Sequence, residues 1–172
     1  TSNDESMVHW GETIDLGYTT TGDAENSINS FYIHDVHLTD LEPNTRYYYK
    51  AVTGSLESQI FDLVTPVELG NESSLKVIAM SDMQKDWSNF NKFQEIINQG
   101  IFSYLEIGDS LLLTDALDLV LIPGDLVDNG INHAEWSDHF FGPSEPLFSH
   151  VPLYPVMGNH EYNSSYYFSY FN

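Results

Sequence analysis

Five polar residues that follow apolar runs are the residues of this sequence best placed to do chemistry. They are Asp82, Gln84, Asp125, Asn159 and His160. Each comes within a few residues of a segment typical of a buried β-strand, and the carboxyl ends of parallel strands form the edge of an α/β sheet where ligands bind. Because neighbouring strands lie only about 4.8 Å apart, we expect the side chains to converge around metal ions, with Asp125 at the centre.

These side chains offer oxygen and imidazole ligands and no thiolate. Such donors suit Fe, Mn, Zn or Mg. A carboxylate can bridge two cations, and two metal ions about 3.5–4 Å apart can activate a water molecule for attack on phosphorus. A neighbouring histidine can donate a proton to the leaving oxygen or stabilise the transition state. Ordinary turn chemistry is the competing interpretation for any one of the three segments, and it explains three in succession less well.

The composition is that of a globular, strongly acidic chain. Its 172 residues suffice for one ordinary domain or two small ones. Five Lys and Arg against 26 Asp and Glu give a formal charge of −21, which excludes the basic footprint of a nucleic-acid-binding protein. No run of about 18 apolar residues occurs, so no membrane span is predicted. The absence of Cys excludes disulfides, thiolate metal sites and a Cys nucleophile.

Residues 1–66 are predicted to form an all-β domain. Segments rich in aromatic and β-branched residues predict strands at 30–38, 45–53 and 58–64, with weaker candidates at 7–10 and 14–17. Residues 67–74 form a polar connector with Gly and Pro nearby, and they predict a domain boundary.

Residues 75–172 alternate strand and helix patterns, as an α/β domain does. Leu119–Ile122 is an apolar run expected to be buried on both faces. After it, Asp128 and Asn129 are expected to shape the turn, with Gly130 permitting a positive φ. Strands are predicted at 75–80, 117–122 and 153–157, and helices at 88–106 and 133–141, the second ended by Gly142 and Pro143.

Two sets of motifs carry a resemblance to known families. The segments Asp82-x-Gln84, Gly124-Asp125 and Gly158-Asn159-His160-Glu161 resemble the first three motifs of the calcineurin-like metallophosphoesterases. The segment 38–49 resembles the corner between the fifth and sixth strands of fibronectin type III domains, where a tyrosine, here Tyr47, bonds back to the chain.

In combination the two parts resemble purple acid phosphatases and their bacterial relatives. This resemblance implies a multidomain β + α/β fold. A partial fibronectin type III-like β-sandwich would be followed by the N-terminal half of an α/β metallophosphoesterase sandwich.

The resemblance also implies a role for each site residue. Asp82 would bind the first of two divalent or trivalent metal ions, Asp125 would bridge both, Asn159 would bind the second, and His160 would be the catalytic histidine. The family commonly has His at the position of Gln84, so Gln84 is either a weaker oxygen ligand or a residue that acts through a ligand.

Two further departures from the family bear on the function. Asp128 stands where purple acid phosphatases carry a tyrosine ligand, so the colour of a tyrosinate–iron pair should be absent. The family completes its site with a later His and a Gly-His-x-His motif, which these 172 residues do not contain. We therefore expect this chain to be the N-terminal part of a longer protein and to be inactive alone.

The expected function of the whole protein is hydrolysis of a small phosphate monoester in an extracellular or periplasmic compartment. Two alternatives stay open. One is a phosphodiesterase or nucleotidase of the same superfamily. The other is a non-catalytic, secreted binding or adhesion protein with a degenerate phosphoesterase domain.

Overall fold

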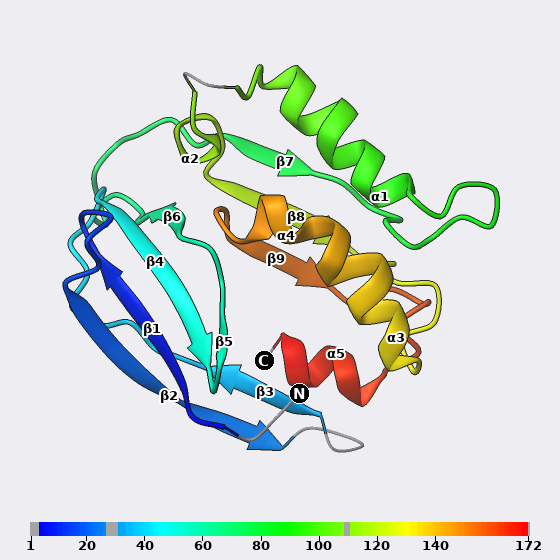
Figure 1. Ribbon diagram of the computed structural model, residues 1–172. Coiled ribbons are helices and arrows are strands. Elements are labelled where there is room, and N and C mark those ends of the chain that lie inside the picture. The colour runs from blue at the N-terminus through cyan, green and yellow to red at the C-terminus, as the bar shows by residue number, and fades with distance from the viewer. Residues whose placement is uncertain (1–3, 27–30, 109–110, 172) are drawn as a thin grey trace. The chain divides into compact units, whose positions relative to one another are not determined.

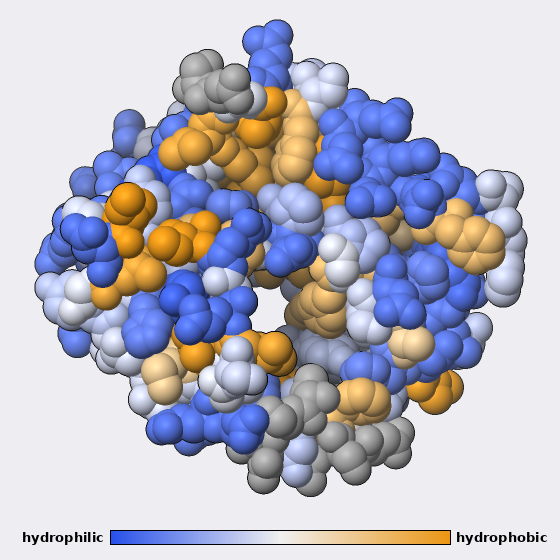
Figure 2. Space-filling view, viewed as in Figure 1, coloured by the Kyte–Doolittle hydropathy of each residue, from blue (hydrophilic) through white to orange (hydrophobic). Residues whose placement is uncertain are grey.

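The computed structural model describes residues 4–26, 31–108 and 111–171. The chain divides into two compact units, Thr1–Ser74 and Leu75–Asn172 (Figure 1). Hydrophilic residues cover most of the face seen in Figure 2, as the excess of acidic side chains requires. Within the described ranges, no helix is both long enough and apolar enough to cross a membrane.

The first unit is built around an antiparallel β-sheet. Its strands follow the order β3-β2-β1-β4-β5, and β6 also pairs with β4. The long strand β2 pairs with β1 through its first half and with β3 through its second half. The strand bounds are β1 (Ser6–Gly11), β2 (Tyr18–Asn26), β3 (Tyr32–Asp35), β4 (Arg46–Thr53), β5 (Leu56–Glu57) and β6 (Phe61–Val64).

The strands predicted for this unit are confirmed with one exception. Segments 30–38, 45–53 and 58–64 contain β3, β4 and β6, and the segment 7–10 lies within β1. Ser30 lies outside the described residues. The strand predicted at 14–17 is wrong. Leu16 has a left-handed backbone (φ 51°) and its N–H donates to the Thr13 carbonyl at 3.2 Å, so the chain turns here and re-enters the sheet at Tyr18.

The corner before β4 is pinned by Tyr47. Its side chain is buried, and its hydroxyl oxygen accepts a hydrogen bond from the Glu42 backbone N–H at 2.9 Å. The Thr65 hydroxyl donates to the Glu42 carbonyl at 2.6 Å, which ties the end of β6 to the same corner. The predicted bond from Tyr47 back to the chain is confirmed.

The second unit is built on a parallel sheet of three strands. These are β7 (Val77–Ala79), β8 (Leu119–Pro123) and β9 (Leu153–Val156), with β8 in the middle. The three predicted strands are therefore confirmed, and their carboxyl ends share one edge. The helical segments are α1 (Lys92–Glu95), η1 (Ile96–Phe102), α2 (Leu113–Ala116), α3 (His133–Glu135), η2 (Trp136–Phe141), α4 (Gly142–Phe148) and α5 (Ser165–Tyr170), of which η1 and η2 are π-helical.

The sheet of the second unit is packed on one face. Val120 and Ile122 of β8 are fully buried, whereas Leu121 between them is 40% exposed. Tyr154, its partner in register on β9, is exposed as well. The prediction that β8 is buried on both faces is wrong for the described chain, because the aromatic core formed by the helices, with Phe93 stacked 5.6 Å from Phe140, covers only the other face.

Both predicted helices exist with shifted ends. The first begins at Lys92 rather than residue 88, because the Asp86 carboxylate accepts the Ser88 N–H at 2.7 Å and holds a turn there. The second does not stop at Gly142 and Pro143, and helix continues through α4. Two prolines, Pro143 and Pro146, lie within α4 without ending the helix.

Candidate metal centre

The segments after β7, β8 and β9 carry all five predicted site residues. We call residues 80–85, 124–130 and 157–163 the first, second and third tips. Asp82 and Gln84 lie in the first tip, Asp125 in the second, and Asn159 and His160 in the third. Because β8 is the central strand, the tip that carries Asp125 lies between the other two.

Backbone hydrogen bonds join the first tip to the second. The Asp82 N–H donates to the Gly124 carbonyl at 3.4 Å, and the Gln84 N–H donates to the Asp125 carbonyl at 3.0 Å. Asp82 is exposed and left-handed (φ 60°), and its Oδ2 accepts a bond from the Ser81 hydroxyl at 2.6 Å.

The second and third tips approach each other through two glycines. Gly124 has φ +103°, and a Cβ added to it would lie 2.9 Å from the Gly158 Cα. A Cβ on Gly158 would lie 2.2 Å from Asp125 Oδ1 and 2.4 Å from the Asp125 nitrogen. Both approaches are too close for any side chain, so the Gly-Asp and Gly-Asn-His motifs need glycine for steric reasons.

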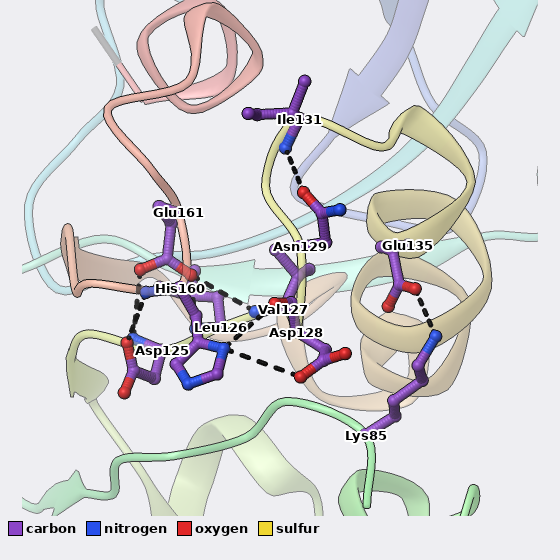
Figure 3. A network of polar contacts seen from close by, with 10 residues as sticks. All are labelled: Lys85, Asp125, Leu126, Val127, Asp128, Asn129, Ile131, Glu135, His160 and Glu161. Atoms are coloured by element: carbon purple, nitrogen blue, oxygen red, sulfur yellow. Dashed lines mark hydrogen bonds and ion pairs between the residues drawn. The ribbon is translucent and has the colours of Figure 1, made fainter. Parts of the chain in front are cut away.

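Asp125 and His160 are in direct contact. The His160 backbone N–H donates to Asp125 Oδ1 at 3.1 Å (Figure 3). Asp125 is left-handed (φ 55°), which aims its side chain across to the third tip. Within the part of the chain that the structure describes, Asp125 Oδ2 has no hydrogen-bond partner, so one carboxylate oxygen stays available.

The His160 ring is held by Asp128. Its Nδ1–H donates to the Asp128 carbonyl at 2.9 Å and lies 3.5 Å from Asp128 Oδ1 (Figure 3). This hydrogen bond raises the pKa of His160, the nearby carboxylates of Asp125 and Asp128 add to the effect, and burial opposes it. Since a carbonyl can only accept, the proton is fixed on Nδ1 and Nε2 is left for a substrate.

The prediction gave Asp128 only the role of shaping the turn. Its contact with His160 was missed, and the one signal was an acidic residue three positions after Asp125. Gly130 does not have the expected positive φ, which Gly124 has instead. A Cβ on Gly130 would lie 2.5 Å from the Glu161 carbonyl oxygen, so close packing explains this glycine.

Glu161 is the last residue of the Gly158–Glu161 motif, and the sequence analysis predicted no role for it. It is fully buried. Its Oε1 accepts the N–H groups of Leu126 (2.8 Å) and Val127 (3.3 Å). Its Oε2 accepts those of Asp125 (3.1 Å) and Gly158 (2.6 Å).

The donor atoms of the tips fit oxygen-preferring cations. Gln84 Oε1 is buried without a hydrogen-bond partner in the described ranges, as expected of an amide oxygen directed at a ligand. Carboxylate and amide oxygens are suitable ligands for Mg or Mn. No group of three or more His, Asp or Glu side chains able to hold a metal ion occurs among the described residues, so the amide oxygens would have to complete the site.

Comparisons with known proteins agree with this arrangement of parts. Residues 75–172 match the family model described as calcineurin-like phosphoesterase. Residues 1–65 match the model described as purple acid phosphatase, N-terminal domain.

Two relatives in sequence are named as purple acid phosphatases. Two proteins of Arabidopsis thaliana, named probable inactive purple acid phosphatase 27 and 24, are 31% and 30% identical to this chain over 140 and 141 residues. Each match covers 76% of this chain, which spans 22% of the relative's length.

The structure of a purple acid phosphatase from yellow lupin (Lupinus luteus) seeds shares the fold. Its TM-score is 0.66 at 24% sequence identity, over 92% of this chain and 31% of that one. The chain therefore belongs to the calcineurin-like phosphoesterase family and carries the N-terminal domain of purple acid phosphatases in front.

Proposed function

We propose that the whole protein hydrolyses small phosphate monoesters at a centre of two metal ions held by the three tips. The observation that carries this proposal is the hydrogen-bonded array centred on Asp125. The Asp125 carbonyl accepts the backbone N–H of Gln84 in the first tip, and Asp125 Oδ1 accepts the backbone N–H of His160 in the third. The array leaves Asp125 Oδ2 open at the centre of the sheet edge.

The proposed ligands would come from all three tips. Asp82 would hold the first ion, Asp125 would bridge, and Asn159 would hold the second. Gln84, through its unpartnered Oε1, would support the first ion. When bound, the two ions would activate water and neutralise charge on the phosphoryl group. They would also reverse the repulsion that a chain of formal charge −21 exerts on a phosphate ester.

His160 would act on the leaving group. Its Nδ1–H is held by Asp128, so the ring is fixed in orientation and Nε2 is the nitrogen that can face a substrate. A proton on Nε2 can pass to the leaving oxygen as the ester bond breaks. Preference for monoesters rests on the domain arrangement, which this chain shares with purple acid phosphatases.

A non-catalytic binding protein is the second candidate. It is favoured by the names of the two plant relatives, which describe them as probably inactive, and by the small number of charged donors in the site. For either function we propose an extracellular or periplasmic location, because a strongly acidic surface suits surroundings rich in salt or divalent cations.

Calorimetric titration with Mn²⁺ tests the metal centre. The wild-type chain should bind Mn²⁺. Asp125→Asn should weaken binding by more than the roughly 10- to 100-fold that follows loss of a residue supporting a metal ligand. Asp138→Asn, a change at an exposed residue of η2, should leave binding unchanged. Equal affinity of the Asp125→Asn variant and the wild type would remove Asp125 from the centre.

Assays on the full-length protein separate the two candidate functions. Metal-dependent release of p-nitrophenol from p-nitrophenyl phosphate supports the phosphatase. Tight Mn²⁺ binding without turnover of either aryl phosphate monoesters or diesters supports the binding protein.

A further inference from the structure

We propose that Glu161 is a positioning residue whose carboxylate fixes the spacing between the second and third tips. The effect of Glu161 on metal binding rests on the proposed function, whereas the contact between its carboxylate and the two tips does not. The proposal starts from the fact that, within the described residues, all four hydrogen-bond partners of the Glu161 carboxylate are backbone N–H donors.

The four donors come from both tips. Asp125, Leu126 and Val127 belong to the second tip and Gly158 to the third. Oε2 accepts from both tips at once, from Asp125 at 3.1 Å and from Gly158 at 2.6 Å. A single oxygen atom of the Glu161 carboxylate therefore joins the two segments.

The surroundings of Glu161 are those of an anion site filled by the protein itself. The side chain is fully buried, and no Lys, Arg or His pairs with it within the described ranges. Successive N–H groups that point into a concave turn stabilise an anion, and those of residues 125, 126 and 127 do so here. The charge is thus compensated by backbone dipoles, which hold the turn in one shape.

The backbone of Glu161 is fixed as well. Its carbonyl oxygen and Cα lie only 2.5 and 2.6 Å from the position that a Cβ on Gly130 would take. The Gly130 N–H donates to the His160 carbonyl at 2.9 Å. Both ends of Glu161 are therefore anchored to the second tip, so its side chain has a defined reach.

This link acts on the candidate metal centre through Asp125. The Asp125 N–H is held by Glu161 Oε2 while Asp125 Oδ1 is held by the His160 N–H. The left-handed backbone of Asp125 (φ 55°) is costly for a non-glycine residue, and the carboxylate of Glu161 offsets that cost. The distance from Asp125 to Asn159 then depends on Glu161.

Only a carboxylate of this length meets all four donors. Glutamine has the same shape, but its NH₂ group would face the N–H groups that one of the two oxygens now accepts. Aspartate keeps both acceptors and is one methylene shorter, so it cannot reach both tips. Either change should loosen the contact without substituting any of the five site residues.

Amide hydrogen exchange measured by NMR tests the contact without any metal. In Glu161→Gln, exchange at residues 125, 126, 127 and 158 should be about 10- to 100-fold faster, as expected when a hydrogen bond to a charged group is lost. Glu135→Gln removes another buried glutamate of the same unit, one that pairs with Lys85, and should leave these four amides unchanged. Unchanged protection in Glu161→Gln would overturn the proposal.

Mn²⁺ titration tests the consequence for the centre. Glu161→Gln should lower the affinity about 10- to 100-fold, the loss typical of residues that orient metal ligands. Glu145→Gln, a change at an exposed glutamate of α4, should not. Faster exchange at the four amides with unchanged affinity would overturn the positioning role.

Failure of the proposed function and misfolding of the variant can each be told apart from failure of this proposal. If the wild-type chain takes up no Mn²⁺, the metal function fails and the exchange data alone decide for or against the contact. If Glu161→Gln does not fold, the wild-type protein decides. Scalar couplings across the hydrogen bonds, from the four amide nitrogens to the Glu161 carboxylate carbon, should be detectable, and their absence would overturn the proposal.

Discussion

Asp125 and Asp82 are the two carboxylates of the candidate metal centre, and they are held in different ways. Both have left-handed backbones, with φ of 55° and 60°. Asp125 is half-buried. Its N–H donates to the Glu161 carboxylate, and its Oδ1 accepts the His160 N–H. Asp82 is exposed, and among the described residues its carboxylate accepts a hydrogen bond only from the neighbouring Ser81.

The first tip is anchored beyond its site residues. Lys85 pairs with Glu135 of α3 in a buried ion pair, and its ammonium lies 5.0 Å from the centre of the Trp87 ring. The two aspartates therefore differ in how firmly the chain holds them. We infer that the second and third tips form a preorganised half of the candidate centre, and we expect Asp82 to adjust its position when an ion binds.

The largest effect should come from filling the contact between the second and third tips. Gly158→Ala would place a Cβ 2.2 Å from Asp125 Oδ1, so the tips must separate. We expect a loss of about 3 kcal/mol in the free energy of unfolding, measured by urea denaturation.

Gly100→Ala is the matched control. A Cβ there meets nothing within 4 Å, and in the helical segment η1 alanine should stabilise by about 0.5–1 kcal/mol. If both alanine variants unfold at the wild-type urea concentration, the second and third tips are not in the close contact described above.

A smaller effect should separate the two aspartates in the metal-free protein. Asp125→Ala removes the acceptor of the His160 N–H and should cost about 1.5 kcal/mol of unfolding free energy. Asp82→Ala removes only an exposed contact and should change it by less than about 0.5 kcal/mol. Equal losses in the two variants, measured in chelator-treated samples, would contradict the difference between the two halves.

The positions of the site residues could be predicted because they depend on simple periodicities. Apolar runs of strand length located β7, β8 and β9, and parallel pairing puts their carboxyl ends at one edge. The bond from Tyr47 could be predicted for a similar reason, since a local corner motif determines it. Whether Asp82, Gln84, Asp125 and Asn159 bind metal stays a prediction.

The supporting contacts could not be predicted from residue types. Glu161 binds N–H groups whose directions depend on the backbone angles of Gly124 and Asp125, and Asp128 holds His160 through its carbonyl, which every residue has. The ends of the helical segments were missed because π-helical turns and Pro143 follow local geometry rather than apolar spacing.

The smallest effect concerns the support of the third tip from α5. The Tyr167 hydroxyl donates to the Pro155 carbonyl of β9 at 3.2 Å, and Tyr167→Phe should cost about 1 kcal/mol near neutral pH.

Burial raises the pKa of Tyr167, and the charge of Glu161 adds to the shift. The folded state therefore keeps the phenol proton more tightly than the unfolded chain, whose tyrosine ionises near pH 10. This contribution is complete below pH 10 and declines as the pH rises through the higher folded-state pKa. The wild type should lose stability above pH 10 faster than Tyr167→Phe, so that urea midpoints of the two proteins converge. Equal midpoints of the two proteins from pH 7 to 11 would show that the hydroxyl does not support β9.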